Sequence, residues 1–188
     1  MKKDFLTPVI ALFTICLVAA VLLAGTNEIT KTKIIKSQEK AKQESLSLAF
    51  SDAKSFSSEQ EYVVDGLSVA YSTAFSDKDE TIGYVFITEQ KGYGGPVEVL
   101  TGISPDGKIK KVIILSMTDE TPGLGQNASK PDFLSQFDEK SDSLVLSKQP
   151  VAENEIQGVT SATFTSSAVL DCVNASLKVY KTLFGGEA

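Results

Sequence analysis

The longest apolar run of the chain lies near its N-terminus. Residues 5–25 contain no charged side chain, and the first charged residue after them is Glu28. About 20 apolar residues are needed to cross a hydrocarbon core of roughly 30 Å, so the run is long enough to span a membrane. A cleaved signal peptide is the alternative, because small residues end the run, but a signal h-region has only about 7–15 residues. The pattern therefore predicts a transmembrane helix over 5–25.

The charges around this run predict its orientation. Lys2 and Lys3 precede it, and the positive-inside rule then places residues 1–4 in the cytoplasm. Residues 26–48 are rich in Lys and Glu and are typical of a charged helical stalk. Residues 49–188 have more acidic than basic side chains, which does not suit lying on an anionic membrane face. We therefore expect the protein in the cell membrane as a single-pass protein, with an extracytoplasmic domain over 49–188.

Short strand-like runs fill most of this domain. Strands are expected at 62–64, 67–71, 84–87, 97–103, 109–115 and 144–146. The Pro and Gly of the turn at 104–108 predict that the two strands beside it form a hairpin. Helices are expected at 131–137 and at 167–184, where apolar residues recur at three- and four-residue spacing. Several strands followed by a terminal helix indicate an α+β fold with an antiparallel-rich sheet.

The composition narrows the chemistry that is open to the chain. Its 188 residues include no His, no Trp and only two Cys, and the formal net charge is −6. Without His there is no Ser-His-Asp triad, no bis-His haem and no Cys₂His₂ zinc site. Two Cys cannot hold an iron–sulfur cluster, which takes about four protein ligands. An acidic chain also argues against a nucleic-acid partner. We therefore identify no catalytic residue and no metal ligand.

Two glycine-containing loops have more features than a turn requires. At 91–96, three Gly and one Pro surround Tyr93, which indicates either a wide turn or a backbone that approaches a flat ligand stacked on the Tyr ring. At 119–125, Pro and two Gly bracket Leu124. A Pro-Gly turn explains this second loop. An apolar contact for a ring system, with free N–H groups for the edge of the ring, explains it equally well.

A third loop precedes the terminal helix and is crowded with hydroxyl groups. Six of the eight residues between positions 160 and 167 are Ser or Thr. One or two of them would be enough to cap the helix N-terminus. The whole set lies where the helix dipole and unpaired N–H groups favour negative charge, which makes an anion site with phosphate as its natural ligand. Capping alone and phosphate binding both remain open from the pattern.

Taken in order along the chain, these features resemble a known family. The matching features are the N-terminal span, GYGGPVEVLTGI, DGKIKKVIIL, DETPGLG and TSATFTSSAV. Together they are similar to the flavin-binding domain of the Rnf complex G subunit. They also resemble its relative, the C subunit of the sodium-translocating NADH:quinone reductase, which is generally longer than this chain. In this family a dedicated flavin transferase joins FMN through its phosphate to the last Thr of an S/T-G-A-T sequence.

The resemblance implies a site, residue by residue. Thr163 is the implied attachment point of one covalent FMN. The other implied cofactor-binding residues are Thr160, Ser161, Ala162, Thr165, Glu120, Thr121, Gly123, Leu124, Gly125 and Tyr93. Ser161 stands where the family usually has Gly, and Gln157 stands where an Asp commonly precedes the motif.

The resemblance also implies a function and partners. It indicates an electron-transfer subunit of a complex that moves electrons between ferredoxin and NAD⁺ and translocates Na⁺ or H⁺, with no turnover by the isolated subunit. The implied partners are the flavin transferase and the integral-membrane and cytoplasmic iron–sulfur and flavin subunits. One alternative is a covalent-FMN subunit of the quinone reductase or of an extracellular electron-transfer chain. The other is a non-redox extracytoplasmic module that binds a phosphate ester.

Overall fold

The computed structural model describes the backbone of residues 2–185. Within this range the side chains of residues 2–7, 28, 29, 32, 35, 36 and 38 are not described. Met1 of the predicted cytoplasmic N-terminus 1–4, and residues 186–188 of the predicted domain, lie outside the described residues. The chain forms two compact units, Met1–Lys42 and Gln43–Ala188. Sequence patterning divides the chain at residue 49, whereas the second compact unit starts at Gln43.

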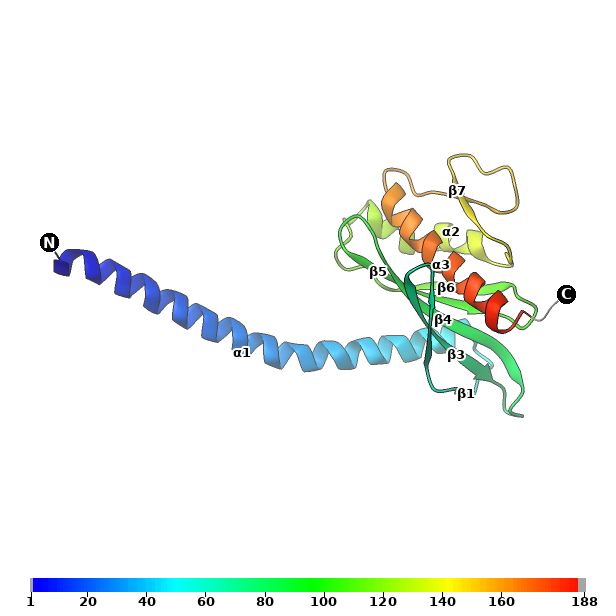
Figure 1. The fold of residues 1–188 in the computed structure, drawn as a ribbon, viewed down its shortest axis with the longest axis horizontal. Coiled ribbons are helices and arrows are strands. Elements are labelled where there is room, and N and C mark those ends of the chain that lie inside the picture. The colour runs from blue at the N-terminus through cyan, green and yellow to red at the C-terminus, as the bar shows by residue number, and fades with distance from the viewer. Residues whose placement is uncertain (1, 186–188) are drawn as a thin grey trace. The chain divides into compact units, whose positions relative to one another are not determined.

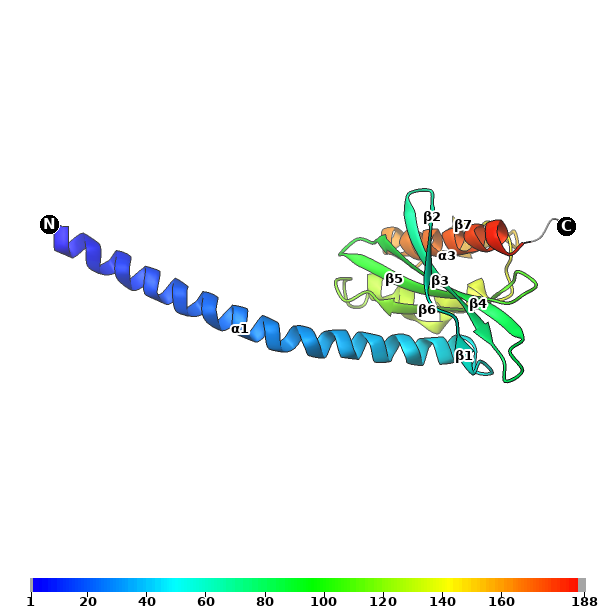
Figure 2. The same ribbon diagram turned by 60° about the horizontal axis from the view of Figure 1, so that its bottom comes forward.

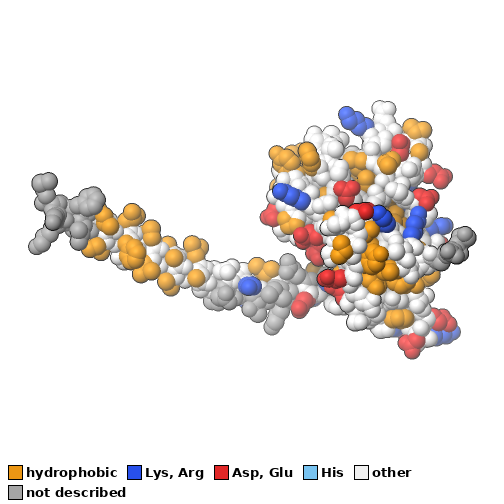
Figure 3. Space-filling view, viewed as in Figure 1, with side chains coloured by type: hydrophobic (Ala, Val, Ile, Leu, Met, Phe, Trp, Pro, Cys, Tyr) orange, Lys and Arg blue, Asp and Glu red, His pale blue; other side chains and the backbone are white. Residues whose placement is uncertain are grey.

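The first unit consists of most of helix α1 (Lys2–Ala49). Its segment Pro8–Asn27 has a mean hydropathy of 2.6 and is long and apolar enough to cross a membrane. Figure 3 shows the apolar side chains of this segment as a continuous band along the helix. The Thr14 hydroxyl donates a hydrogen bond to the Ile10 carbonyl oxygen at 2.8 Å, which satisfies the polar group without water. The predicted N-terminal apolar helix is therefore confirmed, while its insertion and orientation stay predictions.

The second unit is built on an antiparallel sheet (Figure 1). Its strands are β1 (Ser55–Phe56), β2 (Gln60–Val64), β3 (Leu67–Phe75), β4 (Thr81–Lys91), β5 (Pro96–Ile103) and β6 (Ile109–Ser116). The strand order is β1-β3-β4-β5-β6, and β2 also pairs with β3. Strands β5 and β6 form the expected hairpin, with Ile103 opposite Ile109. The predicted antiparallel-rich α+β fold is confirmed.

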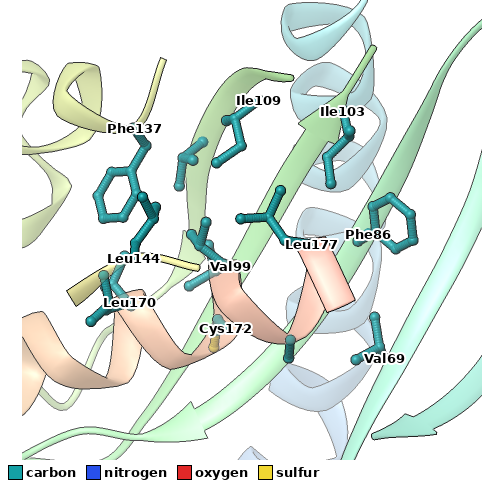
Figure 4. Close-up of a cluster of buried hydrophobic side chains, with 14 of the residues drawn as sticks. Val69, Phe86, Val99, Ile103, Ile109, Phe137, Leu144, Leu170, Cys172 and Leu177 are labelled. Atoms are coloured by element: carbon teal, nitrogen blue, oxygen red, sulfur yellow. The ribbon is translucent and has the colours of Figure 1, made fainter. Parts of the chain in front are cut away.

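Helix α3 (Thr163–Leu183) covers one face of the sheet, as the second view shows (Figure 2). Its apolar side chains meet those of β3 to β6 in the main core, which Figure 4 shows in close-up. Cys172 lies in this core, and burial raises the pKa of its thiol to about 12. The thiol therefore stays protonated and packs as a small apolar group.

The opposite face of the sheet is covered by the last turn of α1. Leu46, Ala49 and Phe50 form a second, smaller core with residues of β3, β4 and β5. The Phe50 ring lies so close to the sheet that a Cβ on Gly83 would fall 2.2 Å from Phe50 Cζ. Position 83 must therefore be Gly if this ring is to reach the sheet.

The remaining elements are short, and some of them were not expected. They are η1 (Gly125–Ser129), α2 (Pro131–Leu134), η2 (Ser135–Phe137), β7 (Val145–Ser147) and β8 (Glu155–Gln157). The helix expected at 131–137 is formed by α2 and η2. Strands β1 and β8 were not predicted, and β8 pairs with β7 in parallel. The predicted start of the terminal helix at 167 is wrong, because α3 begins at Thr163.

Two hydroxyl groups are buried in the sheet without a hydrogen-bond partner among the described residues, those of Thr88 and Thr101. Thr101 is fully buried on the α3 side of β5, opposite Phe86. A buried unpaired hydroxyl costs about 1–3 kcal/mol, and Val has the same shape without it. We therefore expect Thr101→Val to raise the free energy of unfolding by about 1 kcal/mol in urea denaturation. The same substitution at Thr182, whose exposed hydroxyl bonds to the Lys178 carbonyl, should cause no such rise.

Candidate functional site

The three loops singled out in the sequence meet at one cavity of about 400 Å³. Its wall is formed by Tyr93, Glu120, Thr121, Leu124, Gly125, Ser161, Ala162, Thr163, Phe164 and Thr165. All but Phe164 were predicted as site residues. Two other predicted residues, Thr160 and Gly123, do not line the cavity, although both lie in loops that form it.

Glu120 joins the three loops. Its side chain is only 2% exposed. Its Oε1 accepts hydrogen bonds from the backbone N–H groups of Tyr93 and Gly94, at 2.7 and 3.1 Å. Its Oε2 accepts a hydrogen bond from the Thr165 hydroxyl at 2.9 Å. One carboxylate therefore links the β4–β5 loop and the first turn of α3 to the loop that follows β6.

The glycines of the first two loops make room for this carboxylate. A Cβ on Gly92 would lie 2.2 Å from Glu120 Oε1, and one on Gly125 would lie 2.1 Å from Oε2. A Cβ on Gly94 would lie 1.9 Å from the Asp119 carbonyl oxygen. The sequence left open whether the first loop is a wide turn or brings its backbone close to a flat ligand. In the structure its glycines allow close packing against residues 119 and 120.

The loop at 119–125 contains the Pro-Gly turn that was one interpretation of its sequence. The Leu124 N–H donates to the Thr121 carbonyl oxygen at 3.2 Å. Gly123 has a φ of 78°, which is the conformation that the third residue of a type II turn requires. The turn leaves Leu124 44% exposed at the cavity wall. The turn and the apolar contact are therefore compatible.

The first turn of α3 presents unpaired backbone donors. The N-cap residue is Ala162, which has no side chain able to cap the helix. The first helical hydrogen bond runs from the Ser166 N–H to the Ala162 carbonyl oxygen. Within the described part of the chain, the N–H groups of Thr163, Phe164 and Thr165 have no acceptor. The interpretation that the Ser and Thr residues only cap the helix is therefore wrong.

Five of the six hydroxyl residues of the third loop fall into two sets, and the sixth, Ser167, is partly buried within α3. Those of Thr165 and Ser166 are buried and hydrogen-bonded, to Glu120 and to the Ala162 carbonyl respectively. Thr160, Ser161 and Thr163 are exposed. Among the described residues, the Thr163 hydroxyl has no hydrogen-bond partner, and Thr163 is the exposed Thr that lines the cavity at the start of α3. Thr163 and Thr165 therefore differ both in exposure and in hydrogen bonding.

Ser161 has a φ of 61°, in the left-handed region that favours Gly. This conformation costs a residue with a Cβ about 1–2 kcal/mol. We expect Ser161→Gly to raise the free energy of unfolding by about 0.5–1 kcal/mol, because relief of strain exceeds the entropy that Gly adds to the unfolded chain. Thermal unfolding measures the change. Ser167→Gly, inside α3, should lower the stability by about 0.5 kcal/mol instead.

Two exposed aromatic rings stand at the cavity. Tyr93 is 74% exposed and Phe164 is 73% exposed. Their ring centroids lie 6.3 Å apart at an interplanar angle of 42°. Phe164 was missed from the sequence, although a single aromatic residue within a run of small hydroxyl residues was a visible signal. With Leu124, these rings add apolar surface to a cavity wall that also contains the first turn of α3.

A larger hollow, of about 710 Å³, lies elsewhere on the domain. Asp65, Asn174 and Lys178 are among the residues that line it, and it contains none of the predicted site residues. Its Lys178–Asp65 ion pair, at 2.7 Å, is exposed to solvent. Size alone therefore does not identify the functional site.

Comparisons with known proteins identify the domain that contains this cavity. Residues 92–178 match the model of the FMN-binding domain, and all residues that line the smaller cavity fall within this range. The crystal structure of NqrC from Shewanella oneidensis superimposes with a TM-score of 0.55 at 21% identity, over 73% of this chain and 72% of that chain. The corresponding C subunit of the Na⁺-translocating NADH-quinone reductase from Parabacteroides distasonis gives 0.54 at 24% identity, over 64% and 65%. These likenesses show the fold, and with the domain match they define an FMN-binding domain.

Sequence similarity identifies the family more narrowly. The G subunit of the proton-translocating ferredoxin:NAD⁺ oxidoreductase complex of Clostridium ljungdahlii is 35% identical over 173 residues, covering 92% of this chain and 89% of the relative. The G subunit of the Na⁺-translocating complex of Acetobacterium woodii is 38% identical over 190 residues, with the same coverage. The chain belongs to the family of G subunits of ion-translocating ferredoxin:NAD⁺ oxidoreductase complexes, the Rnf type. The resemblance seen in the sequence is confirmed.

Proposed function

We propose that this protein is the electron-transfer subunit of a membrane-bound, ion-translocating ferredoxin:NAD⁺ oxidoreductase and carries one FMN linked by a phosphoester to Thr163. The observation that carries the proposal is the exposed Thr163 hydroxyl, which has no hydrogen-bond partner among the described residues, at a cavity inside the FMN-binding domain match. Two relatives that match 92% of this chain are named as the G subunits of such complexes.

The end of α3 fits the phosphate of FMN. The N–H groups of Thr163, Phe164 and Thr165 have no acceptor within the described residues, and they lie at the positive end of a helix of 21 residues. Such a helix end binds anionic oxygens through its amide donors and its dipole. A phosphodiester keeps one negative charge after attachment, so these amides would still hold it.

The apolar side of the cavity fits the isoalloxazine ring. Tyr93, Leu124 and Phe164 would contact its faces, and the backbone of Thr121 would meet its edge. When bound, FMN supplies the electron-transfer chemistry, and the protein supplies position and electrostatic environment. Electron relay does not require a general acid or base, in keeping with a site built without His.

The sequence supports a cellular arrangement for this subunit. Residues 1–4 lie in the cytoplasm, 5–25 cross the membrane, 26–48 form the stalk, and the flavin domain is extracytoplasmic. A covalent bond keeps the cofactor on a protein exposed to the outside, where lost FMN is not replaced. The partners are the integral-membrane and cytoplasmic subunits of the complex, and a flavin transferase attaches the FMN.

Intact mass spectrometry of the protein purified from its own membranes tests the proposal. We expect the mass of the chain plus FMN less one water. An unmodified mass would overturn the proposal and would favour the non-redox phosphate-ester-binding module. An FMN adduct excludes that module, and co-purification with ferredoxin:NAD⁺ oxidoreductase subunits then separates this function from a role in a quinone reductase.

A further inference from the structure

Attachment of FMN to Thr163 does not require a carboxylate, yet the Glu120 side chain provides one at the cavity. It is a buried carboxylate that also lines the cavity. It accepts three hydrogen bonds, from the Tyr93 N–H at 2.7 Å, the Gly94 N–H at 3.1 Å and the Thr165 hydroxyl at 2.9 Å. An ionised carboxylate only accepts hydrogen bonds, so three donors directed at one carboxylate fit its charged form.

No opposite charge accompanies this carboxylate. Among the described residues that line the cavity, Glu120 has the only charged side chain. No described Lys forms an ion pair with it either. Because Glu120 is buried, water and salt screen its charge less than they screen a surface charge. The wall of the cavity therefore carries a fixed negative charge that is balanced only by amide and hydroxyl dipoles.

We propose that Glu120 is a positioning residue whose charge lowers the midpoint potential of the flavin in this cavity. The inference rests on the proposed function, because it requires FMN in the cavity. Reduction adds electrons to the isoalloxazine, and a fixed anion at the cavity wall makes that addition less favourable. Glu120 also holds the β4–β5 loop and the first turn of α3 in place, which fixes the charge relative to the ring site.

A redox titration of the flavinylated Glu120→Gln protein tests the inference. Gln has the same shape, keeps an acceptor oxygen and removes the charge. Asp119→Asn is the matched control, because it removes one charge from the neighbouring residue, which is exposed and does not line the cavity. We expect Glu120→Gln to increase the ratio of reduced to oxidised flavin at least tenfold at a fixed applied potential. For a one-electron couple, this corresponds to a midpoint potential that is about 59 mV more positive. The midpoint potential of Asp119→Asn should stay near that of the wild type. An unmoved potential in Glu120→Gln would overturn the inference.

Thr165→Val separates the charge of Glu120 from its role in packing. It removes the hydroxyl that donates to Oε2 and leaves the carboxylate in place. The potential should therefore not become more positive. A positive shift as large as that of Glu120→Gln would show that loop geometry, and not charge, sets the potential.

A measurement on the wild type keeps the inference testable if Glu120→Gln does not fold. A charge that opposes reduction must itself be perturbed when the flavin is reduced, because coupling between two sites is reciprocal. The reduced-minus-oxidised infrared spectrum should then contain a carboxylate band, and absence of the band overturns the inference.

Intact mass is measured before these experiments, because it separates the inference from the proposed function. If the wild-type protein carries no FMN, both the proposed function and the inference are overturned. If it carries FMN but Glu120→Gln does not change the midpoint potential, only the inference is overturned.

Discussion

Thr163→Val is expected to abolish covalent flavin attachment completely. Expressed together with the flavin transferase and separated by denaturing electrophoresis, the variant should show no flavin fluorescence, whereas the wild type should fluoresce. The reason is chemical, because Val has the shape of Thr without the hydroxyl that forms the phosphoester. Thr163 is exposed and its hydroxyl has no partner among the described residues, so the stability should change by no more than about 0.5 kcal/mol.

Thr182→Val is the matched control for this experiment. Thr182 lies on the same helix, is exposed, and does not line the flavin cavity. Its variant should fluoresce like the wild type. Fluorescence that persists in Thr163→Val would show that another hydroxyl is the acceptor, and peptide mass mapping would then locate it.

The sequence predicted most of the fold because its larger elements have regular patterns. The hairpin of β5 and β6 follows from a Pro-Gly turn between two apolar runs, and the apolar spacing of α3 marks a helix. Strands β1 and β8 span two and three residues and contain one apolar residue each, so they show no apolar run or alternation. The start of α3 was misplaced because an Ala, without a side-chain cap, occupies the N-cap position.

The sequence predicted only part of the candidate site, and the reason differs from that for the fold. Loop sequences and the family resemblance indicated which segments belong to it, and those segments do meet at one cavity. No local pattern shows that Glu120 bonds to Thr165, which is 45 residues away in the chain. The glycines were visible as signals of close approach, but the groups that they approach are this carboxylate and Asp119. Long-range hydrogen bonds of this kind are set by tertiary packing, so sequence patterns do not specify them.

The end of α1 is the other place where tertiary packing changes the interpretation of the sequence. Residues 26–48 are typical of an exposed, charged stalk, yet Leu46 is 6% exposed. Phe50 follows directly after the helix and is fully buried against the sheet. Lys110 Nζ lies 4.8 Å from the centre of its ring. The helix therefore ends inside the core of the flavin domain.

Phe50→Ala is expected to lower the free energy of unfolding of the flavin domain by about 3–5 kcal/mol, the usual cost of removing a buried Phe side chain. This is a large fraction of the roughly 5–15 kcal/mol that stabilises a typical domain. Thermal unfolding of the detergent-solubilised full chain, followed by near-ultraviolet circular dichroism, measures the loss. Leu48→Ala provides the control, because Leu48 lies on the same turn of α1 but is 70% exposed, and its stability should change by no more than about 0.5 kcal/mol. Equal effects of the two substitutions would show that the end of α1 does not belong to the core.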